Sequence, residues 1–347
     1  KKYTLFVSLH FMNNFKEISK PFIVAEIGNN HEGSLKNAIK LVEAAKMSGA
    51  NAVKFQIFNP YEFVSRKDMK RIQQLKKFAL KKADILKLKK KCDELNIIFF
   101  ATPLDIESAN FLNKIQKIFK ISSGDNNYID LLKKVRSFKK PVIISTGLMN
   151  YKDVNNLVNF FKKNSFYKNK YNICLMHCVS SYPANKNNIN LNSITFLKKK
   201  FPNVTIGYSD HTKGYKIATT AFNLGAEIIE KHFTLSNNFS NFRDHKISLN
   251  PKSFSNFVKE IKFLKKIQGN FEKKINVDEI KNYSLMRRKI ILKTNLKIGK
   301  KIKRENISIL RSPEKGIFAS DINKVIGKKL INNIKKFENL LFDDLKK

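Results

Sequence analysis

The sequence predicts a (β/α)8 TIM barrel followed by a small C-terminal domain. Short β-rich runs alternate with segments of helical periodicity between residues 20 and 235. The runs are almost continuously apolar, which is typical of parallel strands covered on both faces. Eight βα units over about 250 residues match the usual size of such a barrel. The runs are FIVAEIG (22–28), AVKFQIF (52–58), IIFFATP (97–103), FKISSG (119–124), PVIISTG (141–147), NICLMHC (172–178), VTIGYSD (204–210) and EIIEKHF (227–233).

The segments between these runs have the features of helices. In SLKNAIKLVEAAKMSGA, Ser34 is a suitable N-cap and Gly49 a stop signal, and the apolar residues follow a helical period. Segments 83–96 and 128–140 behave likewise. A doubly wound open sheet is the alternative fold. It usually has fewer strands, and no G-x-G-x-x-G turn follows the first run.

Composition changes define the expected domains. Residues 1–15 are expected to be a tail, in which residues 1–11 precede Met12, a natural start for a cytoplasmic enzyme. The barrel is expected over 16–268. A polar linker follows over 269–283, and a compact accessory domain over 284–347 contains short strands such as KIILKT.

The charge and the cysteines exclude several classes of protein. The net charge of +40 suggests nucleic-acid binding, but only eight of the 68 basic residues are Arg, and the lysines are scattered along the chain. We therefore expect no dedicated nucleic-acid function, although a basic surface attracts anionic substrates. No run approaches 18 apolar residues, so no membrane span is expected. Cys92, Cys174 and Cys178 are expected to be buried thiols.

Nearly every predicted strand ends in a polar or reactive side chain. Active sites of barrels lie at the C-terminal ends of the strands, so these side chains are expected to converge on one site. Any one of them alone has an ordinary explanation as a cap or a satisfied core group. The residues are Glu26, Lys54, Gln56, Thr102, Ser122, Ser123, Ser145, Thr146, His177, Ser209, Asp210, His211, Glu230, Lys231 and His232.

Two histidines end neighbouring predicted strands. His211 in GYSDHT and His232 in EKHFT would face one site, and two imidazoles with nearby carboxylates suit Mn2+, Zn2+ or Co2+. The alternative is that they are hydrogen-bonded core residues, with Asp210 or Thr212 capping the next helix.

Lysines and hydroxyls at the strand ends suggest an anion pocket, and nearby carboxylates suggest acid/base chemistry. Lys54 lies within an apolar run, where a lysine requires an anionic partner. The alternative is that the lysines extend to solvent. Glu26 and Asp244 could hold or exchange protons with a polyhydroxy substrate. His31 and His245 are expected to order their loops. The pocket is expected to contain Lys54, Lys120, Ser123, Ser145 and Ser209.

Several motifs in order resemble the bacterial sialic acid (nonulosonate) synthases. They are FIVAEIGNNHEGS, GANAVKFQ, FFATPLD, FKISSGD, STGLM, HCVSSYPA, IGYSDHTKG and EKHFT. Residues 284–347 resemble the antifreeze-like (SAF) domain that ends these enzymes. The resemblance implies a homodimeric transferase of the N-acetylneuraminate or legionaminate type, which condenses phosphoenolpyruvate with an N-acylated mannosamine-type sugar and releases phosphate by C–O cleavage.

The resemblance also implies roles for individual residues. His211 and His232 match the ligands of Mn2+, with Mg2+ or Co2+ as alternatives. Arg311 matches an arginine that reaches the partner's site in a domain-swapped dimer. Residues matching contacts to phosphoenolpyruvate and the product carboxylate are Lys54, Thr102, Lys120, Ser123, Ser145 and Ser209; those near the sugar and the new bond are Glu26, Gln56, Tyr182 and Asp244.

Three positions depart from the neuraminate pattern and leave the acceptor sugar open. Leu104 stands where Phe is expected, Asp125 where Glu is common, and Ser180 where Asn is found. A 2,4-diacetamido-2,4,6-trideoxymannose, giving legionaminic acid, fits about as well as N-acetylmannosamine. The sequence also leaves open a phosphoenolpyruvate-dependent synthase that acts on a phosphorylated sugar, and a sugar- or RNA-binding protein without activity.

Overall fold

The computed structural model describes residues 14–18 and 20–346, which divide into two compact units at Gly269/Asn270. Residues 1–11, expected to be a tail or upstream sequence, lie outside the described residues. The sequence places Phe15 at the end of the expected tail. It is fully buried, however, and its N–H donates to the carbonyl of Tyr171. The packed core of the first unit therefore begins before residue 16.

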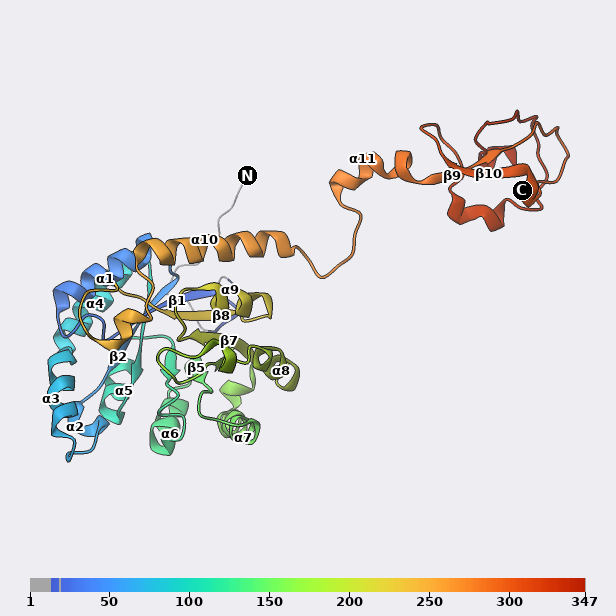
Figure 1. Cartoon of the computed structure of the whole chain (residues 1–347). Helices are drawn as coiled ribbons and strands as arrows, with labels where there is room; N and C mark the ends of the chain where they lie inside the picture. Colours follow the sequence, from blue (N-terminus) through green and yellow to red (C-terminus); the bar gives the residue numbers. More distant parts are fainter. Residues whose placement is uncertain (1–13, 19, 347) are drawn as a thin grey trace. The chain divides into compact units, whose positions relative to one another are not determined.

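The first unit contains a nearly closed eight-stranded parallel barrel with helices around it (Figure 1). The order of pairing is β3-β2-β1-β8-β7-β6-β5-β4, so β3 and β4 are the two ends of the ladder. All eight predicted strands are confirmed. They are β1 (Phe22–Gly28), β2 (Ala52–Ile57), β3 (Ile98–Pro103), β4 (Phe119–Ile121), β5 (Val142–Ser145), β6 (Ile173–His177), β7 (Thr205–Asp210) and β8 (Ile228–His232).

Local sequence explains where the first helix begins and ends. The Ser34 side chain accepts a hydrogen bond from the N–H of Asn37, and Gly49 adopts φ of 91° just beyond the helix, as expected. The helices of this unit are α1 (Leu35–Met47), α2 (Pro60–Phe63), α3 (Met69–Phe78), α4 (Lys82–Glu94), α5 (Ile106–Asn113), α6 (Ile129–Ser137), α7 (Tyr151–Lys162), α8 (Asn192–Lys200), α9 (Lys216–Asn223), α10 (Pro251–Gln268), and the short 3-10 turns η2 (Ser165–Lys168), η3 (Lys186–Asn188) and η4 (Arg243–Lys246).

Apolar core lies on both faces of the barrel strands, because successive side chains of a strand point to opposite faces. One face of each strand packs against the helices in the larger cluster, which includes Ile23, Ala25 and Ile27 of β1. The other face forms a second apolar cluster that includes Phe22 and Val24 of β1. Continuing this alternation, the next residue on the second face of β1 is Glu26. The members of the second cluster are Phe15, Ile18, Phe22, Val24, Ala52, Phe100, Ile118, Ile143, Cys174, Met176 and Ile228.

The second unit has its own apolar core and a two-stranded antiparallel sheet. The KIILKT run forms its first strand, as predicted. Helix α11 occupies part of the stretch expected to be a linker, and its residues are largely exposed. The elements are α11 (Val277–Met286), β9 (Arg288–Leu292), η5 (Arg304–Asn306), β10 (Ile307–Arg311), η6 (Ala319–Lys324) and η7 (Phe342–Asp344).

The sequence predicts no membrane-spanning helix and three buried thiols. Within residues 14–18 and 20–346, no helix combines the length and apolarity needed to cross a bilayer. Cys92, Cys174 and Cys178 are buried free thiols, as predicted.

Candidate functional site

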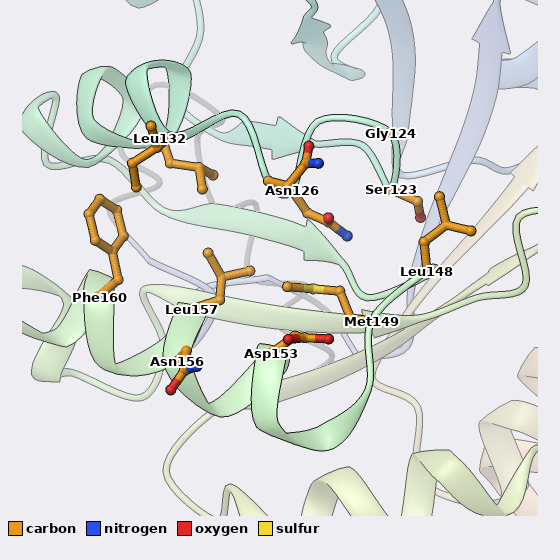
Figure 2. Close-up of a pocket in the computed structure, with 12 residues that line it drawn as sticks. Ser123, Gly124, Asn126, Leu132, Leu148, Met149, Asp153, Asn156, Leu157 and Phe160 are labelled. Carbon is orange, nitrogen blue, oxygen red and sulfur yellow. The ribbon is translucent and has the colours of Figure 1, made fainter.

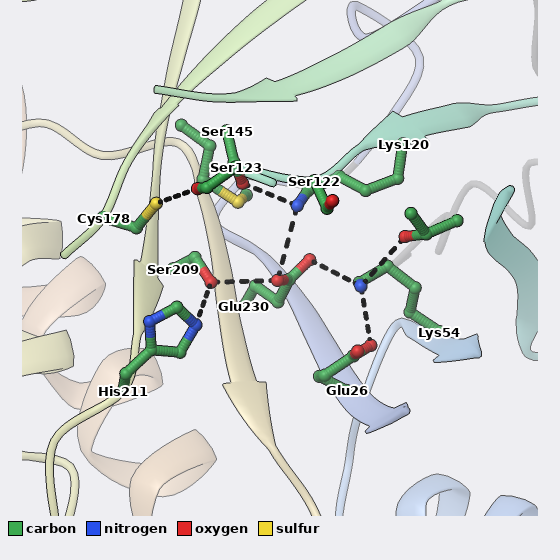
Figure 3. A network of polar contacts seen from close by, with 12 residues as sticks. Glu26, Lys54, Lys120, Ser122, Ser123, Ser145, Cys178, Ser209, His211 and Glu230 are labelled. Atoms are coloured by element: carbon green, nitrogen blue, oxygen red, sulfur yellow. Dashed lines mark hydrogen bonds and ion pairs between the residues drawn. The ribbon is translucent and has the colours of Figure 1, made fainter. Parts of the chain in front are cut away.

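Four charged side chains meet at the C-terminal ends of the barrel strands (Figure 3). The Nζ of Lys54 lies 2.9 Å from Oε2 of Glu26 and 3.7 Å from Oε2 of Glu230. The Nζ of Lys120 lies 3.6 Å from Oε1 of Glu230. All four residues are no more than 3% exposed. We call them the lysine–carboxylate cluster. The expectation that Lys54 requires an anionic partner is confirmed.

Hydroxyl groups from three further strands form hydrogen bonds with members of the cluster. Lys54 donates to the hydroxyl of Thr102 at 3.2 Å, and Lys120 donates to that of Ser145 at 2.7 Å. Ser209 donates to Oε1 of Glu230 at 2.9 Å. The strand ends therefore converge as the sequence predicted.

The pairing of the strands explains why these residues meet. Glu26 is the register partner of Lys54 on β2 and of His232 on β8, while Ser209 on β7 is opposite Glu230. Neighbouring strands of a parallel sheet bring such partners to within about 5 Å of each other. The cluster is thus a direct result of barrel register.

The cluster separates the pKa values of its two carboxyl groups. Burial raises the pKa of Glu26 to about 7, against the opposing effect of Lys54. Burial acts on Glu230 too, but Lys120, Lys54 and the Ser209 hydrogen bond lower its pKa to about 2. Burial also lowers the pKa of Lys120, even though Glu230 opposes this effect. At neutral pH, Glu230 is therefore ionised, whereas Glu26 retains a proton to a higher pH than an ordinary carboxyl group.

Gln56 lies beside Glu26, as the sequence predicted for the site. Its Nε2 donates to Oε1 of Glu26 at 3.4 Å, and its Oε1 accepts from Asn29 at 2.9 Å. Gly28 adopts φ of 53°, and a Cβ there would lie 3.2 Å from Oε1 of Glu26. A glycine at this position therefore leaves room for the carboxyl group.

His211 and His232 lie together at the ends of β7 and β8, and we call them the imidazole pair. Their ring centroids are 5.6 Å apart. The ring of Tyr182 lies 4.2 Å from that of His211 and is covered in turn by the Arg243 guanidinium, 4.6 Å from the tyrosine centroid. Burial lowers the pKa of both histidines, and for His232 the neighbouring His211 adds to the effect. Both rings are therefore neutral at pH 7, the form that binds metals.

The hydrogen bonds of the imidazole pair are compatible with a metal. The Nδ1 of His211 lies 2.8 Å from the carbonyl oxygen of Val179, so Nδ1 carries the proton and Nε2 retains a lone pair. The Nδ1 of His232 is buried and has no hydrogen-bond partner. Among the described residues, no group of three or more His, Cys, Asp or Glu side chains could hold a metal. A cation here would have two protein ligands and coordination positions open to water or substrate.

Several polar residues near the site order its loops. Asp210 accepts from the N–H and hydroxyl of Thr212 at 2.9 and 2.8 Å.

His31 accepts from the N–H of Gly33 at 3.0 Å, and His245 contacts Thr234 at 2.7 Å and Glu32 at 3.2 Å. The loop-ordering roles expected for His31 and His245 are compatible with these contacts.

The remaining predicted residues of the barrel unit lie in loops at the strand ends. Asp244 in η4 is buried and lies 3.2 Å from Nε of Arg243. Ser123 contacts the thiol of Cys178 at 3.1 Å. Asp125 accepts from Ser122, and burial raises its pKa. Ser180 Oγ is buried without a hydrogen-bond partner.

A cavity of about 420 Å³ opens between α6 and α7 (Figure 2). Ser123 belongs both to the lining of this cavity and to the network of Figure 3. Apolar side chains such as Leu132, Leu157 and Phe160 form much of the remaining lining. The cavity is therefore adjacent to the polar site rather than part of the lysine–carboxylate cluster.

Arg311 belongs to the separate C-terminal unit. It is exposed at the end of β10, opposite Arg288 in the register of the sheet. Its predicted role at a partner's site remains a prediction.

The sequence pattern understates the importance of two residues. From sequence, Glu230 is only a carboxylate near the histidines, yet it contacts both lysines of the cluster. Strand alternation contained the signal, because residues 230 and 232 lie on the same face of β8. Cys178 contacts Ser123 but had no expected role at the site, and nothing in its spacing indicated one.

Comparisons with known proteins agree with this architecture. Residues 41–273 match the NeuB family and residues 287–346 match the SAF domain. The N,N'-diacetyllegionaminic acid synthase of Campylobacter jejuni is 38% identical over 92% of this chain and 99% of that protein. The corresponding synthase of Legionella pneumophila is 35% identical over 93% of this chain and 94% of that protein.

A solved structure of a sialic acid synthetase is also similar to this chain. The N-acetylneuraminic acid (sialic acid) synthetase of Leptospira borgpetersenii is 36% identical, with a TM-score of 0.72 over 76% of this chain and 90% of that one. Fold and site together define a (β/α)8-barrel protein with a charged cluster at its strand ends and a SAF domain. The chain belongs to the NeuB family. The predicted resemblance to sialic acid (nonulosonate) synthases is thereby confirmed.

Proposed function

We propose that the protein is a nonulosonic acid synthase that condenses phosphoenolpyruvate with an N-acylated mannosamine-type sugar and releases phosphate by C–O cleavage. Its relatives from Campylobacter jejuni and Legionella pneumophila carry the name N,N'-diacetyllegionaminic acid synthase. The charge balance of the lysine–carboxylate cluster is the observation that carries the proposal.

The cluster has more positive than negative charge when Glu26 is protonated. Lys54 and Lys120 then face only one ionised carboxylate, Glu230. The lowered pKa of Lys120 indicates that the chain's own carboxylates do not fully compensate its burial. A phosphate or carboxylate group of phosphoenolpyruvate would supply the missing negative charge. The hydroxyls of Ser145 and Ser209 could rotate and donate hydrogen bonds to the bound anion.

The reaction would proceed by addition and elimination. C3 of phosphoenolpyruvate attacks the aldehyde carbon of the open-chain sugar, whose oxygen takes up a proton, and positive charge develops at C2. Water adds to C2 and loses a proton. The tetrahedral intermediate expels phosphate by cleavage of the bond between C2 and the phosphate oxygen, and its C2 hydroxyl gives its proton to the departing phosphate, which leaves a ketone. Lys54 and Lys120 would hold the anionic groups in position for the attack. Glu26, with a pKa of about 7, is suited to exchange a proton with the reactants during this sequence.

The imidazole pair would hold a divalent metal, with Mn2+ proposed and Mg2+ or Co2+ as alternatives. The lone pair of His211 and the unpartnered nitrogen of His232 support this assignment. A bound cation would supply Lewis-acid polarisation of the sugar aldehyde. The ring of Tyr182, which lies against that of His211, would restrict the position of the imidazole.

The acceptor we favour is 2,4-diacetamido-2,4,6-trideoxymannose, ahead of N-acetylmannosamine. Both relatives described above carry the name N,N'-diacetyllegionaminic acid synthase. The departures at Leu104, Asp125 and Ser180 also set this chain apart from the neuraminate pattern.

Release of phosphate from phosphoenolpyruvate, measured with Mn2+ and each sugar in turn, tests the proposal. We expect sugar-dependent release, with a higher kcat/KM for the diacetamido sugar. Lys54→Met should abolish it, whereas Lys133→Met, at an exposed lysine, should not. Absence of release with both sugars would contradict the proposed reaction. Preference for N-acetylmannosamine would contradict only the choice of acceptor.

A further inference from the structure

A second buried ion pair joins the strands that present the two histidines. Asp210 on β7 and Lys231 on β8 are register partners, and their charged atoms are 3.0 Å apart. Both side chains are 0% exposed. Each residue directly adjoins one member of the imidazole pair in sequence, because Asp210 precedes His211 and Lys231 precedes His232.

The contacts of Lys231 lie on both sides of His211. Its Nζ donates to the carbonyl oxygen of Asp210 at 3.4 Å and also to that of Thr212. The other carboxylate oxygen of Asp210 accepts from the N–H of Thr212. One ammonium group on β8 therefore fixes the backbone on either side of His211, the residue that directly follows β7.

Strand alternation separates this ion pair from the reactive groups. Ser209 and Glu230 contact each other at the lysine–carboxylate cluster, so the next residues along, Asp210 and Lys231, point to the opposite face of the sheet. The ion pair can thus hold the two strand ends together without occupying space at the site.

Stability alone does not account for such a pair. Removing two charges from water costs several kcal/mol, and replacing a buried pair by apolar groups is often neutral or stabilising. A gain in structural specificity is the better explanation where the pair fixes a particular backbone geometry.

We infer that Lys231, together with Asp210, is a positioning residue that fixes the separation of His211 and His232 and thereby sets the affinity for a divalent cation. This inference rests on the proposed metal site. Residues that orient metal ligands typically change affinity by about 10- to 100-fold when altered.

The test is a titration of the full-length protein with Mn2+, in which free Mn2+ is followed by electron paramagnetic resonance. The variants are Lys231→Met and the double variant Asp210→Asn/Lys231→Met. The double variant leaves no buried charge unpaired and retains an acceptor for Thr212, so it is expected to fold even where the single variant does not. We expect the dissociation constant to rise by about 10-fold or more in each folded variant.

Lys289→Met is the matched control. Lys289 is also a buried lysine that donates to backbone carbonyls, those of Ser312 and Glu314, but it lies in the C-terminal unit. This variant should lower the thermal unfolding temperature without changing Mn2+ affinity. Thermal unfolding of every variant separates lost stability from lost affinity.

The outcomes distinguish this inference from the proposed function. If the wild type binds Mn2+ and the folded double variant binds it equally well, the positioning role is wrong and the metal proposal stands. If the wild type binds no Mn2+, both the metal proposal and the positioning role are overturned. Weaker binding in the Lys231 variants together with unchanged binding in Lys289→Met supports the inference.

Discussion

Glu26 and Glu230 contact the same ammonium group of Lys54 from neighbouring strands, but their pKa values move in opposite directions. Glu230 also contacts Lys120 and accepts from Ser209, so its ionised form is stabilised. For Glu26, burial and the neighbouring Glu230 outweigh the opposing effects of Lys54 and the more distant Lys120, and its pKa rises to about 7. In the proposed reaction, Glu230 would remain a fixed anion and Glu26 would exchange a proton.

The raised pKa of Glu26 predicts a specific dependence of stability on pH. Between pH 4.5 and 7 the folded protein retains a proton that the unfolded chain releases, so this residue lowers the free energy of unfolding as pH rises. The decrease amounts to about 3 kcal/mol over the window. In Glu26→Gln this decrease in the free energy of unfolding should disappear, as measured by urea unfolding at about pH 5 and about pH 7.5. Wild-type and variant curves that shift equally with pH would contradict the assignment.

Glu230 should have the opposite effect. Its folded pKa of about 2 means that its stabilising contribution is complete above pH 4.5 and is lost as the pH falls toward 2. Glu230→Gln leaves two buried lysines short of an anion and should lower the free energy of unfolding at pH 7 by about 3–5 kcal/mol. Glu107→Gln, at an exposed partner of Lys82, is the control and should cost about 1 kcal/mol or less.

Lys120 should contribute to binding of phosphoenolpyruvate. Lys120→Met removes a buried charge-assisted donor from the proposed anion pocket. The KM for phosphoenolpyruvate should therefore rise by about 10- to 100-fold in steady-state phosphate-release assays. Lys133→Met again serves as the surface control. An unchanged KM in a folded Lys120→Met protein would exclude this lysine from the anion pocket.

Metal removal should abolish turnover. Treatment with a chelator should stop phosphate release and added Mn2+ should restore it, while His211→Ala should prevent the restoration. His177→Asn is the control and should still allow the restoration, because the Nε2 of His177 contacts the carbonyl of Ile189 rather than the imidazole pair. Undiminished turnover in His211→Ala would defeat the metal proposal.

Arg311 provides a test of the domain-swapped homodimer. Arg311→Ala should inactivate the protein, and mixing it with an inactive barrel variant such as His211→Ala should restore part of the activity. In such a mixed dimer, one site receives an intact barrel and an intact Arg311 from different chains. A lack of restored activity in dimers verified by mass spectrometry would count against the swap.

The sequence predicted most of the fold because the relevant signals are local. Ser34 and Gly49 mark the ends of α1, and the eight apolar runs each became a strand. Local patterns did not predict the burial of Phe15, because this burial depends on the distant segment around Tyr171.

The candidate site was predicted as a set of residues but not as a set of contacts. A polar residue at each strand end was sufficient to expect convergence, since barrel strands end on one side. Strand register determines which carboxylate contacts which lysine. The contacts of Glu230 with both Lys54 and Lys120 could therefore be seen only in the structure.

The sequence by itself determined the barrel, the accessory domain and the family, because periodicity, caps and ordered motifs are properties of the chain. Only the tertiary structure decided the charge state of Glu26, the shared contacts of Glu230 and the pairing of Asp210 with Lys231. Those properties arise from burial and from distances between strands. Both exist only after the barrel has brought β1, β2, β7 and β8 together.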